Sequence, residues 1–321
     1  MIDLLFLVLP GSLLLDLAGP AEAFRLANRH LEQRGKPTAF RLRYLSPEPE
    51  AMSSVGLMLS GLEALPERLP SASWTVLLGQ PGQLKEHRRM LASPDWQAVR
   101  QWLSRQIAPR LLEADSAHRL LSVCAGALLA ADAGLLARRH CTTHHEMLAT
   151  LQDLAPTAEV VNNRVFVIDG PVSSSAGVTA GIDLALHLIA GECGEDVTAS
   201  VAQDMVVYLR RGPRDPELSP LLQHRNHLHP AVHRVQDAIT RQPAEDWSLE
   251  RMAAQGAVTP RHLSRLFATH AQVTPLRYLQ NIRLEHARQA LAHGASVTQA
   301  AMEAGFSSDQ QMRRAAARLS A

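Results

Sequence analysis

Cysteine, lysine and aromatic residues are all scarce in this chain. The three cysteines, Cys124, Cys141 and Cys193, are a sparse and odd-numbered set without the spacing of metal ligands. They predict no disulfide framework and no metal site, and they are typical of a protein of the reducing cytosol. No bound cofactor is expected either. Lysine occurs only at Lys36 and Lys85, so arginine carries nearly all of the positive charge.

A long uninterrupted hydrophobic run is also missing. The apolar opening segment, IDLLFLVLPGSLLLDLAGP, has no basic residues in front of it, contains Asp3 and Asp16, and is interrupted by Pro10 and Gly11. We therefore expect a buried strand, a turn and a second apolar piece rather than a signal peptide or a membrane span. With 46% hydrophobic residues among 321, the chain is too apolar for disorder and long enough for about two domains.

Up to about residue 210, short apolar runs alternate with segments of helix length. The strand-like runs are IDLLFLVL, FRLRYLS, WTVLLGQ, HRLLSV and the two halves of NNRVFVIDGPVSSS, which a turn at Asp169 and Gly170 would join. Helices are expected in AGPAEAFRLANRHLEQ, from Cys124 onward, in AGVTAGIDLALHLIAG and in EDVTASVAQDMVVYLRR. This alternation predicts an α/β domain over residues 1–210, built on a doubly wound and largely parallel sheet.

The pattern changes after RRGPRDPELSPLLQ, whose three prolines and mixed charge predict a linker over residues 211–228. From residue 229 to 321 only helices are expected. Two short helices surround Gly256, with Thr259 and Pro260 at the start of the second, and the same arrangement returns around Gly305. A long amphipathic helix lies between the copies. The repeat predicts an all-α domain with two helix-turn-helix units, and the alternative is a small helical bundle used for dimerisation.

The C-terminal part resembles the AraC/XylS family of bacterial transcription regulators, through SLERMAAQGAVTPRHLSRLF, TPLRYLQNIRLEHARQAL and VTQAAMEAGFSS. In that family the second helix of each unit enters a major groove of double-stranded DNA. Arginine and glutamine there suit the donor and acceptor patterns of guanine and adenine. The positions that the resemblance implies for base contacts are Arg261, Ser264, Arg265, Gln310, Arg313 and Arg314. Each of them is otherwise an ordinary surface residue.

Charge is consistent with this resemblance. From residue 231 onward eleven arginines stand against seven acidic residues, within a chain of net charge +1. The sequence departs from the family at its end, since members usually have Phe where Ala316 stands and continue through another short helix. We expect the first unit to supply most of the specific affinity for DNA.

The segment SVCAGALLAADAGL places Cys124 at the junction of a strand and a helix, followed by small residues. A helix N-terminus favours thiolate, and the carboxyl ends of parallel strands are where open α/β sheets bind ligands. Cys124 is therefore a candidate nucleophile, a redox-sensitive or pocket-lining residue, or a packed small residue. The candidate residues of an effector pocket are Asp16, Glu22, Cys124, Ala125 and His144. Asp16 could instead cap a helix, and His144 and His145 could be strand residues with satisfied hydrogen bonds.

The first domain resembles the flavodoxin-like superfamily of PfpI-type peptidases, isocyanide hydratases and class I glutamine amidotransferases, through LLDLAGPAEAF, SVCAGALLAADAGLLARRHCTTHH and SSSAGVTAGIDLALHL. In the hydratase branch the residues matching Asp16 and Cys124 carry the chemistry, and a Thr follows the Cys. Ala125 stands in that place here, so the hydroxyl is missing.

The combination of the two domains resembles the GlxA-type regulators. It implies a cytoplasmic, homodimeric transcription regulator whose non-catalytic amidotransferase-like domain senses a small metabolite, often a nitrogen-containing compound, and which contacts RNA polymerase if it activates. Three alternatives stay open. They are a cysteine-dependent hydratase or amidase with a DNA-binding appendage, a thiol redox sensor, and a degenerate regulator that no longer binds DNA.

Overall fold

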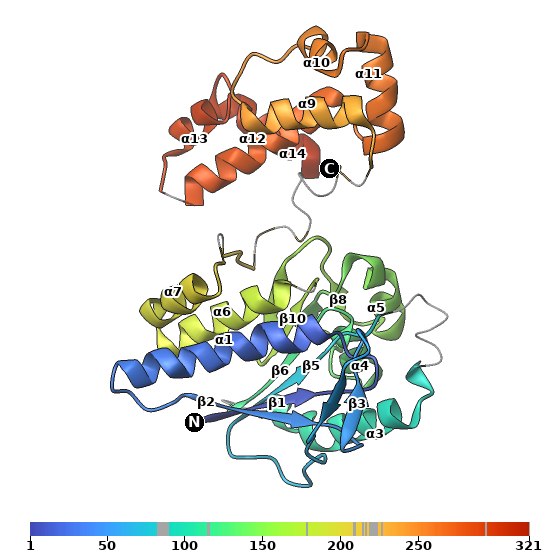
Figure 1. Ribbon diagram of the computed structural model, residues 1–321, viewed down its shortest axis with the longest axis vertical. Coiled ribbons are helices and arrows are strands. Elements are labelled where there is room, and N and C mark those ends of the chain that lie inside the picture. Colours follow the sequence, from blue (N-terminus) through green and yellow to red (C-terminus); the bar gives the residue numbers. More distant parts are fainter. Residues whose placement is uncertain are drawn as a thin grey trace. The chain divides into compact units, whose positions relative to one another are not determined.

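The computed structural model describes residues 1–81, 90–113, 116–177, 179–207, 210–213, 215, 217, 224–225, 227–292 and 294–320. The chain forms two compact units, Met1–Glu217 and Leu218–Ala321, and each is described by itself (Figure 1). The boundary between them falls inside the segment 211–228 that the sequence marks as a linker.

The first unit is built on a six-stranded sheet with the strand order β2-β1-β5-β6-β10-β9. Its strands are β1 (Ile2–Leu7), β2 (Phe40–Leu45), β5 (Ser73–Leu77), β6 (His118–Val123), β10 (Val172–Ser175) and β9 (Phe166–Asp169). All neighbours are parallel except β9 and β10, which form the expected antiparallel hairpin. The largely parallel α/β sheet is thus confirmed. Two small sheets pair β3 (Glu50–Met52) with β4 (Met58–Ser60), and β7 (His140–Cys141) with β8 (Glu159–Val160).

Helices cover both faces of this sheet, and Figure 1 shows α1 and α6 on one side and α3 on the other. The helical elements are α1 (Leu14–Gln33), α3 (Pro94–Trp102), η1 (Leu103–Ile107), η2 (Arg110–Leu112), α4 (Gly126–Asp132), η3 (His145–Met147), α5 (Leu148–Leu154), α6 (Ala180–Cys193) and α7 (Glu195–Asp204). Two glycines bring α1 and α6 close together. A Cβ on Gly19 would lie 2.8 Å from Ile182 Cγ1, and one on Gly181 would lie 3.2 Å from Pro20 Cγ.

Two helix boundaries differ from the expectation. Helix α1 begins at Leu14, so the second apolar piece of the opening segment is the first turn of this helix, and Asp16 is a helical residue. Helix α7 ends at Asp204, well before the expected end at Arg211. The backbone leaves the helix just after it, where Val206 has a left-handed φ of 54°.

In the described part of the second unit every regular element is a helix, as expected. It consists of α9 (Pro230–Arg241), α10 (Leu249–Gly256), α11 (Pro260–Leu266), η4 (Phe267–Ala271), α12 (Pro275–Ala292), α13 (Val297–Glu303) and α14 (Asp309–Ser320). The helix pairs α10–α11 and α13–α14 are the two helix-turn-helix units, and α12 connects them. The side chains of Thr259 and Ser308 cap α11 and α14 by accepting backbone hydrogen bonds from His262 and Gln311.

The two helix-turn-helix units have different cores. The first helix-turn-helix unit is packed around the large side chains of Trp247, Phe267 and Tyr278. In the second helix-turn-helix unit, alanines make up most of the core, together with Phe306 and Met312. Less apolar area is therefore available to stabilise the second helix-turn-helix unit. Among the described residues, none of the helices combines the length and the apolarity that crossing a membrane requires.

Gly126 is a sharp test of the packing between β5 and α4. A Cβ at this position would lie 2.4 Å from the backbone oxygen of Leu77, which cannot move without disturbing β5. We expect Gly126→Ala to lower the free energy of unfolding of the first unit by about 1–3 kcal/mol, measured by urea denaturation. Gly191→Ala in α6 is the control, because nothing lies within 4 Å of its Cβ. It should raise stability by about 0.5–1 kcal/mol, and a loss of similar size in both variants would contradict the packing argument.

Candidate functional site

The carboxyl ends of β5 and β6 meet the first turn of α1 around Gly79. A Cβ on Gly79 would lie 2.6 Å from Asp16 Oδ2, 2.9 Å from Cys124 Cβ and 3.0 Å from the Ala125 nitrogen. Only glycine allows these three groups to approach so closely. The structure thus brings together Asp16, Cys124 and Ala125, at the sheet edge where open α/β folds bind ligands.

Asp16 is fully buried in this cluster. Its Oδ2 accepts a hydrogen bond of 3.0 Å from the Gly79 nitrogen, while Oδ1 has no hydrogen-bond partner within the described part of the chain. The same holds for Oε1 of the neighbouring Gln80. Burial raises the pKa of Asp16 from 3.8 to about 7, against the opposing effect of the Gly79 hydrogen bond. The site therefore presents one buried carboxyl oxygen without a partner, on a group that titrates near neutral pH.

Cys124 lies in a strained turn between β6 and α4. Its φ of 54° is left-handed, its nitrogen donates to the Ser175 oxygen at 3.0 Å, and its own oxygen accepts from Thr143 Oγ1 at 2.8 Å. Burial, and then the charge of Asp16, raise the pKa of the Cys124 thiol to about 12. The expectation of a stabilised thiolate is therefore wrong, because burial outweighs the single backbone hydrogen bond from Ala125.

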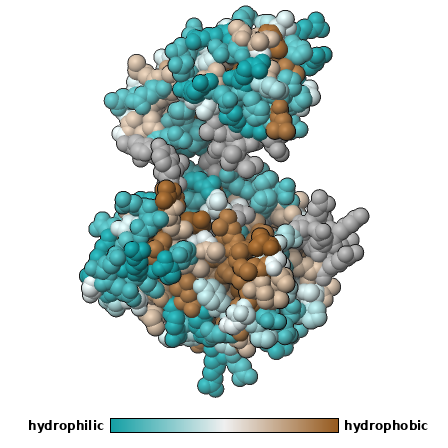
Figure 2. Space-filling view, viewed as in Figure 1, coloured by the Kyte–Doolittle hydropathy of each residue, from teal (hydrophilic) through white to brown (hydrophobic). Residues whose placement is uncertain are grey.

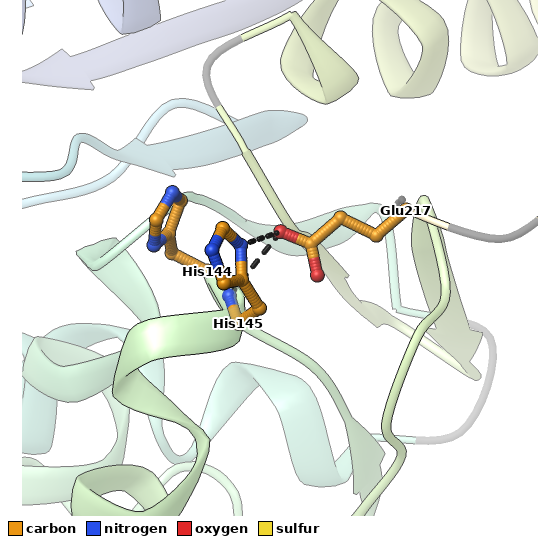
Figure 3. Close-up of side chains that lie close together, drawn as sticks. All are labelled: His144, His145 and Glu217. Atoms are coloured by element: carbon orange, nitrogen blue, oxygen red, sulfur yellow. Dashed lines mark hydrogen bonds and ion pairs between the residues drawn. The ribbon is translucent and has the colours of Figure 1, made fainter. Parts of the chain in front are cut away.

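A second group of polar side chains follows β7. His144 and His145 are not strand residues, since β7 ends at Cys141 and His145 begins η3. The Oε1 atom of Glu217 accepts a hydrogen bond of 3.2 Å from the His145 nitrogen and lies 3.0 Å from His145 Nδ1 (Figure 3). Burial and the neighbouring His145 lower the pKa of His144. Because Thr143 holds the Cys124 turn, this group is connected to the Asp16 cluster through one residue.

Glu22 is the pocket candidate that the structure does not bring to this site. Its side chain is exposed on α1 and pairs with Arg25, with 2.6 Å between Glu22 Oε2 and Arg25 Nε. The Arg25 guanidinium lowers the pKa of Glu22. Conversely, Gly79 and Glu217 were not expected at the site, because their partners are distant in the chain and leave no local signal in the sequence.

A surface groove of about 510 Å³ lies elsewhere on the first unit. It is lined by residues around Arg119, His187 and Glu192, at the amino ends of β6 and β10. Since Cys124 follows the carboxyl end of β6, this groove is at the opposite edge of the sheet and is not the pocket that the sequence predicts.

The candidate DNA-binding side chains lie on α11 and α14. Five of them are exposed and Ser264 is half-buried, with its hydroxyl donating to the Pro260 oxygen at 3.1 Å. In contrast, Leu263 of α11 and Met312 of α14 point into the two cores. Each of these helices therefore has one buried face and one polar, mainly basic, exposed face. Arg313 also pairs with Asp309 of α14 at 3.3 Å.

Comparison with known proteins agrees with this division. Residues 110–191 match the DJ-1/PfpI family, and residues 252–320 match a family described as helix-turn-helix domain. The chain thus combines a DJ-1/PfpI domain with an AraC-type helix-turn-helix domain, as the resemblance to the GlxA-type regulators implied.

Individual relatives match most of this chain or part of it. The HTH-type transcriptional regulator GbdR of Pseudomonas aeruginosa is 29% identical over 308 residues, which are 94% of this chain and 77% of that protein. The HTH-type transcriptional regulator GlxA of Rhizobium meliloti is 31% identical over 206 residues, 63% of this chain and 62% of its own length. The isonitrile hydratase of Pseudomonas putida is 38% identical over 114 residues, 34% of this chain and 47% of the hydratase.

Asp16→Asn tests the buried carboxyl. Because the pKa of Asp16 in the folded protein is about 7, above its ordinary 3.8, the stability that its neutral form contributes is lost as pH rises between these values. The asparagine keeps the acceptor for Gly79 but does not titrate. We expect the free energy of unfolding of Asp16→Asn, relative to the unmodified chain, to rise with pH up to about 7 and then level off. Thermal unfolding across this range measures the effect.

The control is Glu22→Gln, an exposed carboxyl on the same helix. Its relative stability should not rise with pH, since Arg25 lowers the pKa of Glu22. Parallel pH profiles for the two variants would show that burial of Asp16 does not raise its pKa.

Proposed function

We propose that this protein is a transcription regulator that reads double-stranded DNA with α11 and α14 and senses a small metabolite with its first unit. The observation that carries the proposal is the repeated helix-turn-helix, in which both second helices expose basic side chains opposite a buried Leu263 or Met312. The regulators GbdR and GlxA support it by their similarity.

On α11 the N-terminus, capped by Thr259, and the side chains of Arg261 and Arg265 are all exposed to solvent. We expect these arginines to reach base edges in one major groove and Ser264 to contact DNA beside them. Gln310, Arg313 and Arg314 of α14 take the equivalent places in a second groove. Because Arg side chains also release counterions from phosphates, affinity should fall steeply with salt.

The first helix-turn-helix unit supplies most of the affinity in this proposal, because its large aromatic core fixes α11 more firmly than alanines fix α14. Arg265→Ala should therefore weaken binding to the specific DNA site by roughly tenfold to a hundredfold, and Arg314→Ala by clearly less. Fluorescence anisotropy titration with labelled operator DNA measures both. Equal losses would contradict the difference between the two units, and no loss in either variant would contradict the proposed DNA-reading surface.

The effector binds, in this proposal, where Asp16, Cys124 and Ala125 meet, with His144 close by. The free oxygen of Asp16 favours a ligand that donates an N–H or O–H hydrogen bond, which suits a nitrogen-containing metabolite. Such a ligand would satisfy a buried acceptor, and removing this desolvation cost would contribute to its affinity.

The similarity to isonitrile hydratase favours one rival, an enzyme that uses Cys124 as nucleophile. Two features of the site argue against it. Ala125 supplies no hydroxyl next to the cysteine, and burial beside Asp16 raises the pKa of the thiol instead of lowering it. A thiol redox sensor meets the same objection, since oxidation also proceeds through the thiolate. We therefore propose that the first unit binds its ligand without covalent chemistry.

Cys124 should react slowly with thiol reagents. With a pKa raised to about 12, it is almost entirely protonated at neutral pH. We expect peptide mass spectrometry to find Cys124 unmodified after mild treatment with peroxide or iodoacetamide at pH 7.5, under conditions that modify free cysteine added to the same sample. Rapid and selective modification of Cys124 would instead support the enzyme or the redox sensor.

Dimerisation and location belong to the proposal as well. Figure 2 shows apolar residues gathered on one face of the first unit, whereas polar residues dominate the face of the second unit in the same view. The β3–β4 hairpin adds exposed apolar side chains, among them Val55 and Leu57. Exposed apolar patches mark association surfaces, which supports a homodimer formed through the first unit. The proposed regulator acts in the cytoplasm and contacts RNA polymerase if it activates.

A further inference from the structure

Two adjacent histidines and a buried glutamate, of which only His144 has a place in the proposed effector site, form a group of possible metal ligands. One ligand atom each from His144, His145 and Glu217 can be chosen so that all three lie within 4.8 Å of one another. Figure 3 shows the two imidazole rings side by side, with the Glu217 carboxylate directed at His145 from a separate segment. The ring centroids of His144 and His145 are 4.2 Å apart.

Glu217 is buried but only half satisfied. It is 8% exposed, and although Oε1 contacts His145, Oε2 has no hydrogen-bond partner among the residues that the structure describes. A buried carboxylate oxygen without a partner is costly, and bound cations are a common way of satisfying one. This orphaned oxygen is a second indication, besides the arrangement of the three side chains, that a ligand belongs here.

Glu217 belongs to the connecting segment, which we define as the described residues 210–213, 215 and 217 at the end of the first unit. Arg211 and Asp215 contact the rest of the first unit. The Arg211 nitrogen and guanidinium donate to Asp183 of α6 at 3.0 Å and 2.9 Å. The Val165 nitrogen donates to the Asp215 oxygen at 3.0 Å. The glutamate is therefore held at a fixed place beside the histidines by contacts that do not depend on any ligand.

The donor set selects the kind of cation. Imidazole nitrogen together with carboxylate oxygen suits Zn²⁺ and its transition-metal neighbours, whereas Mg²⁺ and Ca²⁺ prefer oxygen ligands alone. Ligand atoms around one zinc ion lie about 2 Å from the metal and hence within about 4 Å of each other. Small side-chain rotations close the remaining difference.

We propose that His144, His145 and Glu217 bind one divalent transition-metal ion, with Zn²⁺ as its representative, and that the ion clamps the connecting segment to the first unit. Three protein ligands leave one coordination position for water or for an atom of a small ligand. Since the connecting segment leads directly into the second unit, occupancy of this site would change how freely that unit can move. This consequence rests on the proposed function, whereas metal binding itself does not.

Zinc binding is tested on the full chain, first freed of metal with a chelator. Competition with a chromogenic chelator should show one tight equivalent of Zn²⁺ per chain, weakened at least about a hundredfold in both His145→Gln and Glu217→Gln. His286→Gln, which removes an exposed histidine of α12, is the matched control and should bind as the unmodified chain does. Unchanged urea midpoints of the metal-free variants show that each still folds.

Two further measurements test which residues bind the ion and whether the ion holds the connecting segment in place. Co²⁺ in place of zinc should give d–d absorption bands without the charge-transfer band of thiolate, and a thiolate band would overturn the ligand set. Zn²⁺ should slow trypsin cleavage after Arg211 in the unmodified chain but not in Glu217→Gln.

Other outcomes separate this proposal from the proposed function. Absence of a tight zinc equivalent, equal binding in all variants, or cleavage that zinc does not slow would overturn the metal site even if the chain binds DNA. A chain that binds zinc as described and fails to bind DNA upholds the site and refutes the regulator.

Discussion

The close approach of backbone segments at the carboxyl edge of the parallel sheet is the constraint on which the site depends. Gly126 lies against the Leu77 carbonyl, and Gly79 against Asp16 and Cys124, at distances that leave no room for a Cβ. These contacts bury the carboxyl and the thiol together, and burial then determines their chemistry. The pKa of Asp16 rises to near neutral and that of Cys124 rises far above it, so the site favours binding over nucleophilic attack.

In the proposed function, sensing would be coupled to DNA binding through residues that the structure holds in place. The CTTHH segment is tied to the Cys124 turn by Thr143, and it meets the connecting segment at Glu217. A ligand near Asp16 would thus act on the Cys124 turn, and an ion at His144 and His145 would act on the CTTHH segment that is bonded to this turn. The ligand or the ion can shift the proposed regulator between two conformational states only if it binds one of these states more tightly than the other.

Much of the fold followed from local patterns. Alternating apolar runs predicted the sheet and its hairpin, and the repeated glycine turns with their capping residues predicted both helix-turn-helix units. The turn around Gly256 shows the limit of this reasoning. The left-handed residue is Ala257, with a φ of 54°, while Gly256 ends α10 and packs against Val235 and Val258. A glycine in a sequence can indicate either a left-handed backbone or close packing, and hydrophobic periodicity does not distinguish between the two.

The site was predictable only where a residue follows a recognisable strand. Asp16 and Cys124 were expected together and lie together, because β1, which leads into α1, and β6, which leads into Cys124, flank β5 and end at the same edge of the sheet. The thiolate and the place of Glu22 were misjudged, since burial and the rotation of a helix depend on contacts from the whole unit. Glu217 gave no signal, because its partner His145 is distant in sequence.

In the proposed function, the second unit reads specific DNA. The most direct test is a salt titration of the full chain on DNA from upstream of its own gene, with random DNA as competitor. We predict tight binding that survives the competitor, with a log affinity that falls linearly with log salt concentration at the slope of several phosphate contacts. Failure to bind at low salt, or equal affinity for both DNAs, would contradict it.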